Sequence, residues 1–205
     1  MEDSIKENGK KIKCMEKEYF IGLMDENTQG KVDRGNLILS RFPIVNKNDV
    51  FYDVPYGIYF DDGKQDFSIF PRTIQHAEIQ AGNQAVNVFN TQGIWGLDGD
   101  DNTRRLRMSK IIRDQIKDKE NVILAGDFNV RPDTKTIHNI EKVLKNVFKD
   151  ELVTTFNMKR KTNPGYATAV VDMIFISHNT AVVSHSCPPV DISDHLPLVC
   201  EFNIN

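Results

Sequence analysis

Cysteine is scarce in this sequence of 205 residues, which contains three: Cys14, Cys187 and Cys200. An odd number without a Cys-x-x-Cys pair excludes a disulfide-stapled miniprotein and gives no spacing suited to a cysteine zinc site. Free thiols are typical of a reducing compartment, so we expect a cytoplasmic protein. No apolar run approaches the ~20 residues of a membrane span, and the acidic, polar start differs from a signal peptide.

Neither sign of charge is in large excess: the sequence has 26 Lys and Arg residues and 29 Asp and Glu residues, which gives a net charge of −3. A protein without a general basic field must bind any polyanionic partner at a local site. No internal repeat, low-complexity tract or Pro/Gly/Ser-rich linker divides the chain. With 40% hydrophobic residues, the sequence predicts one globular domain over residues 1–205 with a sizeable core.

Short apolar runs rich in β-branched and aromatic residues predict a succession of strands, punctuated by proline and glycine. The run 122–125 is uninterrupted, which is typical of a strand buried on both faces. The expected strands cover residues 36–39, 67–70, 73–79, 85–89, 122–125, 170–177 and 198–204.

Two amphipathic helices are expected among these strands. The first has Asn102 or Thr103 as its cap and apolar residues at spacings of three and four as far as Ile116. The second begins near Thr134 and keeps apolar residues on one face as far as Val147. Helices flanking a strand-rich middle predict an α+β fold in which two packed sheets are covered by helices.

The first helix also carries a basic strip. Its positive side chains could face a phosphate, but on an amphipathic helix a solvated face is the favoured interpretation. The strip consists of Arg104, Arg105, Arg107, Lys110 and Arg113.

Polar residues stand where three of the expected strands begin or end. Asp127 and Asn129 follow the buried strand, and Asp194-His195 precede the last one. Asp172 interrupts an apolar strand, and a buried carboxylate needs a partner, for which a histidine is well suited. Each feature has an ordinary alternative: a turn, a cap, or a sheet edge facing water. Their joint occurrence at strand ends favours a functional site.

Five ordered segments closely resemble the endonuclease/exonuclease/phosphatase family, over about residues 19–202. The resemblance implies the deoxyribonuclease-I-like fold, a four-layer α/β/β/α sandwich of two mixed sheets with its site at one end. It also implies hydrolysis of a phosphomonoester or phosphodiester with a divalent cation, Mg²⁺ or Mn²⁺. The segments are residues 35–44, 88–92, 126–129, 171–175 and 193–197.

The resemblance assigns a role to each polar residue. Asp194 would bind the metal, and Mg²⁺ usually takes only one or two protein carboxylates. His195 would contact the phosphate or transfer a proton, with Asp172 orienting its ring. Asp127 would position or deprotonate the attacking water, and Asn129 would donate a hydrogen bond to a phosphate oxygen. Whether Asp127 or His195 is the base stays open.

The sequence departs from the family pattern at two places. Gln92 stands where a phosphate-contacting histidine is usual, so substrate would meet an amide without positive charge. No Gln-Glu pair exists to supply the family's principal metal ligand, and residues 4–17 resemble a polar segment or the tail of a helix. A solvated charge is the favoured interpretation of Glu16 and Glu18. We therefore expect an N-terminally incomplete fold without the opening strand, helix and strand, whose new sheet edge could pair or swap.

Two functions follow from this pattern. The first is an active, metal-dependent phosphoesterase. The second is a truncated or catalytically silent member of the fold that binds phosphorylated ligands. The substrate would be a phosphorylated small molecule or nucleic acid, with duplex DNA not favoured over small phosphoesters or lipid headgroups. The basic run 159–161 is either a solvated loop or an approach for an anionic substrate. The oligomeric state stays open.

Overall fold

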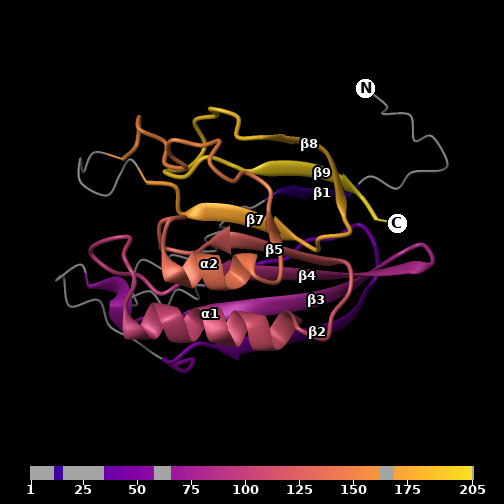
Figure 1. Cartoon of the computed structure of the whole chain (residues 1–205), viewed down its shortest axis with the longest axis horizontal. Helices are drawn as coiled ribbons and strands as arrows, with labels where there is room; N and C mark the ends of the chain where they lie inside the picture. Colours follow the sequence, from indigo (N-terminus) through magenta and orange to yellow (C-terminus); the bar gives the residue numbers. More distant parts are fainter. Residues whose placement is uncertain (1–11, 16–34, 58–65, 162–168, 205) are drawn as a thin grey trace, which may run out of the picture.

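The strands of this computed structural model, which describes residues 12–15, 35–57, 66–161 and 169–204, form two sheets. The larger sheet has six strands in the order β2-β3-β4-β5-β7-β6, and the smaller has three in the order β1-β9-β8 (Figure 1). The larger contains β2 (Ile44–Phe51), β3 (Thr73–Ala81), β4 (Gln84–Gln92), β5 (Val122–Asp127), β7 (Asp172–Ile176) and β6 (Lys145–Asn146). The smaller contains β1 (Ile12–Met15), β9 (Val199–Asn203) and β8 (Ala181–Ser186).

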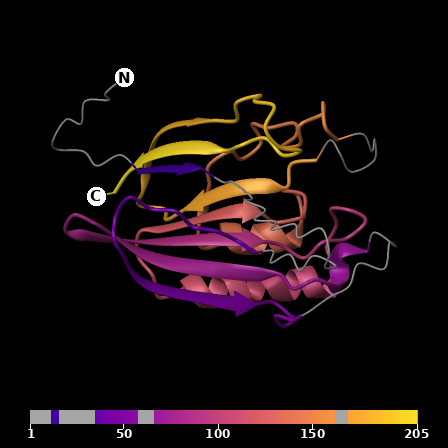
Figure 2. The same cartoon turned by 180° about the vertical axis from the view of Figure 1, so that it is seen from behind.

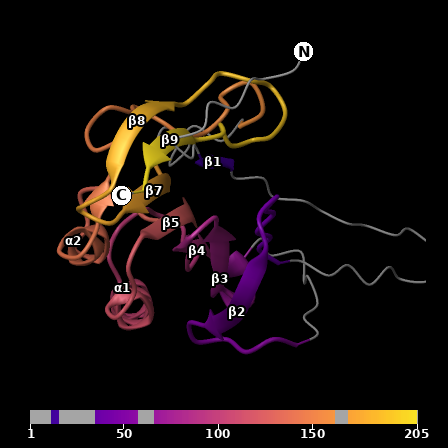
Figure 3. The ribbon, with the colours of Figure 1, turned by 90° about the vertical axis from the view of Figure 1, so that its right-hand side faces the viewer.

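Both α-helices, α1 (Thr103–Ile116) and α2 (Lys135–Glu141), cover the same face of the larger sheet (Figures 1 and 3). The Asn102 side chain accepts from the Arg105 backbone N–H at the start of α1, as the sequence predicted. Thr134 caps α2 in the same way. Neither helix of the described residues is long and apolar enough to cross a bilayer.

The hydrophobic core has two parts, one on each face of the larger sheet. Alternate residues of β4 and β5 separate them: Phe89 and Leu124 pack beneath the helices, whereas Val88 and Ile123 pack toward the smaller sheet. Cys200 and Phe202 of β9 close the second part and are fully buried. The described residues therefore form an α/β/β sandwich (Figure 2), and no helix among them covers the outer face of the smaller sheet.

Strand β5 lies in the middle of the larger sheet and is the expected buried strand. It runs parallel to β4 and antiparallel to β7, so both of its edges are paired. Cys187 and Cys200 are free thiols, as expected. The α+β class is thus confirmed, with the central strand delivering Asp127 to one end of the sandwich.

Two of the expected strands are wrong. Residues 36–39 form no strand, and the Asn36 side chain donates to the backbone oxygens of Thr73 and Asn90. Residues 67–70 contain a 3₁₀ turn, η1 (Phe67–Ile69), because the Asp66 carboxylate accepts from the Ser68 backbone N–H and starts a turn.

The second helix is shorter than its apolar periodicity suggested. It ends at Glu141, and its expected apolar face continues into β6, which pairs with β7. Leu144 and Val147 are still buried, because tertiary packing uses the same side chains in a different backbone conformation.

One residue of the basic strip and the N-terminal segment differ from expectation, whereas Arg107 and Lys110 are exposed as expected. Arg105 is fully buried rather than solvated, and its guanidinium donates to the backbone oxygens of Ile94, Asp98 and Asp100. Within residues 4–17, the described part forms strand β1, which pairs with β9. Glu16 and Glu18 lie outside the described residues.

Candidate functional site

Sheet register brings three of the expected site residues into one row. Gln92 ends β4 opposite Asp127 of the parallel strand β5, and Asp127 is paired with Asp172 at the start of β7. All three side chains share the face toward the smaller sheet, since neighbouring positions of each strand alternate between the two core regions. The row therefore lies at one end of the sandwich.

The backbone around Asp127 requires glycine at two positions. Gly126 has a φ of +150°, and a Cβ there would lie 2.0 Å from the Thr91 oxygen. A Cβ on Gly93 would lie 2.1 Å from the backbone oxygen of Phe128. Strands β4 and β5 thus approach too closely for any side chain at these two points, which fixes the turn that carries Asp127 and Asn129.

Asn129 holds the Asp127 carboxylate in place through hydrogen bonds. Its backbone N–H donates to Asp127 Oδ1 at 2.8 Å, and its Nδ2 donates to Asp127 Oδ2 at 3.1 Å and to the Gly93 oxygen at 3.1 Å. The left-handed φ of 54° lets Asn129 turn back on the carboxylate. Both amide hydrogens are thus engaged, so donation to a phosphate would require one of these bonds to break.

Asp172 and His195 form a hydrogen-bonded pair. A histidine partner for this buried carboxylate was predicted from the sequence. His195 Nδ1 lies 2.8 Å from Asp172 Oδ2, and the carboxylate is buried. Burial opposes the charged form of His195, but the carboxylates of Asp172, Asp127 and Asp194 outweigh burial and raise its pKa to about 10. The imidazole is therefore protonated at neutral pH.

Asp194 lies beside this pair but faces outward. Its carboxylate is exposed, with Oδ2 3.5 Å from Lys161 Nζ. Partial burial raises its pKa, but His195 and Lys161 act more strongly together, so the pKa lies below its ordinary value. Lys161 belongs to the basic run 159–161 and also lies over the Phe156 ring, 4.3 Å from its centroid. Asp194 therefore presents an ionised, accessible carboxylate beside His195.

One segment at the site, residues 154–157, was missed by the sequence analysis. The ring of Phe156 meets the His195 ring edge-on at 4.7 Å, and the two residues form an isolated antiparallel bridge. Buried Asn157 donates from its backbone N–H to the Asp194 oxygen and from Nδ2 to the Ser193 oxygen. The signal in the sequence was weak, because Thr-Thr-Phe-Asn has the composition of an ordinary loop.

The ligand atoms of Asp127, Asp172 and His195 all lie within 4.8 Å of one another. Asp194 is not part of this group of three. Counted together with Asp194 and Lys161, the five side chains have three carboxylates and two cations, a net charge of −1. Carboxylate oxygens are hard ligands of the kind that Mg²⁺ and Mn²⁺ prefer. The carboxylates of Asp127 and Asp172 therefore fit a divalent cation, with the Asp194 carboxylate as a further oxygen donor beside His195.

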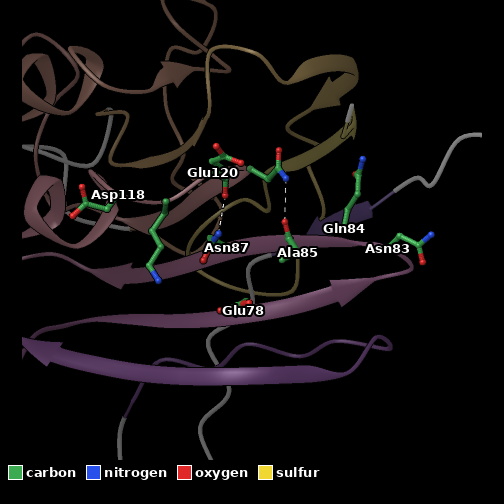
Figure 4. A pocket seen from close by; sticks show the side chains of 9 residues that line it. Glu78, Asn83, Gln84, Ala85, Asn87, Asp118 and Glu120 are labelled. Atoms are coloured by element: carbon green, nitrogen blue, oxygen red, sulfur yellow. Dashed lines mark hydrogen bonds between the residues drawn. The ribbon is translucent and has the colours of Figure 1, made fainter.

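A surface hollow lies at the opposite end of the larger sheet (Figure 4). It is bordered by the β3–β4 hairpin and by the residues just before β5, including Glu78, Asp118 and Glu120. Asn87 in its wall donates to the Glu120 oxygen and contacts buried His76. These hydrogen bonds join β4 to the residues just before β5 and to β3, and the hollow is separated from Asp127 by the length of β5.

A two-sheet sandwich with carboxylates and a paired histidine at one end defines a recognisable class of α+β protein. Residues 6–195 match the model of the Endonuclease/Exonuclease/phosphatase family. The chain belongs to this family. No curated protein matches the chain significantly.

Solved structures share the fold at low sequence identity. An endonuclease/exonuclease/phosphatase family protein from Bacteroides thetaiotaomicron has a TM-score of 0.61 and 19% identity, covering 80% of this chain and 64% of that one. The mannosyl-6-phosphatase Bt3783 of Bacteroides thetaiotaomicron also has a TM-score of 0.61, with 20% identity over 91% of this chain and 77% of that one. D. rerio TDP2, in complex with a single-strand DNA product, has a TM-score of 0.61 and 17% identity over the same shares, 91% and 77%.

Proposed function

We propose that this protein hydrolyses phosphomonoester or phosphodiester bonds with the help of Mg²⁺ or Mn²⁺. The observation that carries the proposal is the hydrogen bond from His195 Nδ1 to buried Asp172, beside Asp127, in a chain of this family. Attack on a phosphoester requires an oriented water, positive charge on the phosphoryl oxygens and stabilisation of the leaving oxygen. The cluster offers a group for each requirement.

His195 supplies positive charge and a proton. Because the surrounding carboxylates raise its pKa to about 10, we assign His195 the role of proton donor and not that of the base. With Nδ1 committed to Asp172, Nε2–H is the group left to donate to a phosphoryl or leaving oxygen. Asp172 fixes the ring and stabilises its charge, without itself touching substrate.

Asp127 is then the group that orients the attacking water or accepts its proton. It lies opposite Asp172 in the sheet and is held by two hydrogen bonds from Asn129. Asn129 acts mainly by keeping this carboxylate in place. Gln92 stands on the other side of Asp127 and offers amide N–H groups to a phosphate oxygen.

Asp194 and Asp127 would hold the divalent cation through their carboxylate oxygens. The bound ion would neutralise charge on the phosphoryl oxygens and lower the energy of the leaving oxygen. The net negative charge of the cluster favours its binding, and Lys161 beside Asp194 is positioned to meet an anionic substrate.

Hydrolysis of bis(p-nitrophenyl) phosphate and p-nitrophenyl phosphate, with Mg²⁺ or Mn²⁺, tests this function. His195→Ala is expected to lower kcat by roughly 10²- to 10⁴-fold, the usual contribution of a positioned acid or base. His138→Ala is the matched control, because His138 is exposed on α2 and should leave the rate unchanged. Equal background rates in all three proteins would instead favour the silent, phosphate-binding member of the family.

The substrate class is proposed more broadly, as a phosphorylated small molecule or a nucleic acid. Among the structures of similar fold, one is a mannosyl-6-phosphatase and another was solved with a DNA product. Binding of a DNA oligonucleotide at several salt concentrations separates the two, because each phosphate contact steepens the salt dependence. A shallow slope with efficient hydrolysis of small phosphoesters would exclude nucleic acid as the substrate.

A further inference from the structure

Asp172 and His195 stand on different parts of the fold. Asp172 starts β7 in the larger sheet, whereas His195 precedes β9 in the smaller one. No ladder of backbone hydrogen bonds within either sheet fixes the distance between them. A contact of 2.8 Å between two sheets therefore needs a structure that spans both.

Thr155 makes hydrogen bonds to both of these segments. Its hydroxyl oxygen accepts from the backbone N–H groups of Val171, at 3.1 Å, and Asp172, at 3.2 Å. Its backbone oxygen accepts from the Leu196 N–H at 2.7 Å, one residue beyond His195. Its backbone N–H donates to the Ala169 oxygen. One residue thus ties the start of β7 to the histidine segment.

Thr155 is also fully buried, with 0% of its surface exposed. Water therefore does not reach the two N–H groups that its hydroxyl satisfies, and a buried N–H without an acceptor costs roughly 1–3 kcal/mol. Loss of the hydroxyl would be relieved by movement of the start of β7. That movement carries the Asp172 carboxylate away from the His195 ring.

We propose that Thr155 is a positioning residue that sets the Asp172–His195 hydrogen bond by holding the start of β7 against the histidine segment. This inference rests on the proposed function, in which that pair serves phosphoester hydrolysis. Thr155 touches no reacting atom and acts through Asp172. Serine can replace it, because serine keeps the accepting oxygen, whereas valine keeps the shape and removes the acceptor.

The test compares Thr155→Val with Thr155→Ser. The first readout is the low-field proton resonance of His195 Nδ1–H, identified by its absence in His195→Gln. It is expected in the wild type and in Thr155→Ser, and shifted or lost by exchange in Thr155→Val. The second readout is the phosphodiesterase rate, in which Thr155→Val lowers kcat by roughly 10- to 100-fold with little change in KM, since misplacement of a catalytic group by about 1 Å has that effect.

Ser109→Ala is the matched control for loss of a buried hydroxyl. Ser109 is fully buried in α1, on the helix-covered face of the larger sheet, and its hydroxyl donates to the Leu106 oxygen. This variant should keep both the resonance and kcat. If Thr155→Val does not fold, Thr155→Ala takes its place with the same expected readouts.

The inference would be overturned if folded Thr155→Val or Thr155→Ala kept the wild-type resonance and kcat. It would also be overturned if folded Thr155→Ser lost the resonance and kcat. Failure of the proposed function has a different signature. In that case the wild type hydrolyses neither substrate, yet the resonance still depends on the hydroxyl at position 155.

Discussion

At the scale of single residues, the decisive interaction is the hydrogen bond between the His195 imidazole and the buried Asp172 carboxylate. Asp172 is buried within β7. Among the contacts described for its side chain, the charged hydrogen bond from His195 is the one that compensates for the burial of the carboxylate. Such an arrangement is costly to break, because removal of either partner leaves the other desolvated and unpaired. The same pairing engages Nδ1, so the proposed function assigns Nε2 to the substrate.

The raised pKa of His195 predicts how stability depends on pH. A pKa of about 10 in the folded protein, against 6.5 for an ordinary histidine, means that the folded state binds the proton more tightly. The stabilisation is fully present below pH 6.5 and is lost as pH rises through about 10. Urea unfolding of the wild type and His195→Gln should show a stability difference that shrinks between pH 6.5 and 10. A difference independent of pH would contradict the protonated state.

At the scale of elements, the site depends on the close approach of β4 and β5. The residue before Asp127 must be glycine for two reasons, its positive φ and the neighbouring Thr91 oxygen. The end of β4 is held in turn by the bond from the Gly93 N–H to the Asp127 oxygen. The backbone that carries Asp127 is therefore constrained by its neighbours on both sides.

Gly126→Ala is expected to destabilise the protein strongly. The positive φ alone costs roughly 1–3 kcal/mol for a residue with a side chain, and the contact of 2.0 Å with the Thr91 oxygen adds to it. Gly35→Ala is the control, because nothing lies within 4 Å of a Cβ at that position. Chemical denaturation should give a large loss of unfolding free energy for the first variant and a change near zero for the second. Equal stabilities would show that β4 and β5 can separate freely.

At the scale of the whole molecule, two sheets converge to gather charge at one end. The larger sheet contributes Asp127 and Asp172, and the chain entering the smaller sheet contributes Asp194 and His195. Segment 154–157 joins these two sources by hydrogen bonds to both. The site is thus a property of the packed sandwich, and separation of the sheets would dismantle it.

Mg²⁺ is expected to stabilise the folded protein, because a ligand bound only by the native state raises Tm by mass action. At about 100 times its Kd the gain is roughly 2.7 kcal/mol. Thermal unfolding with MgCl₂ should give a higher Tm than NaCl at equal ionic strength, and EDTA should reverse the gain. Asp194→Asn should abolish most of it, whereas Asp114→Asn, an exposed change on α1, should not. A Tm insensitive to Mg²⁺ would argue against the proposed metal site.

Much of the fold could be read from local pattern. Short apolar runs rich in β-branched and aromatic residues predicted the strands that became β3, β4, β7 and β9, and the apolar run 122–125 predicted the buried strand β5. Of the two caps that the sequence offered, Asn102 or Thr103, it is Asn102 that caps α1. The local pattern predicted the wrong element at residues 67–70, because the Asp66 side chain starts a turn there. It also failed at Arg105, whose guanidinium is buried because it donates to backbone oxygens of the loop just before α1.

The sequence by itself determined the α+β class, the family, and which polar residues lie at strand ends. Each of these can be recognised from short segments of residues that are close together along the chain. Only the tertiary structure decided that Gln92, Asp127 and Asp172 form one row, since register depends on pairing between strands far apart in sequence. It also decided the charge on His195. That charge is set by three carboxylates whose distances no local pattern encodes.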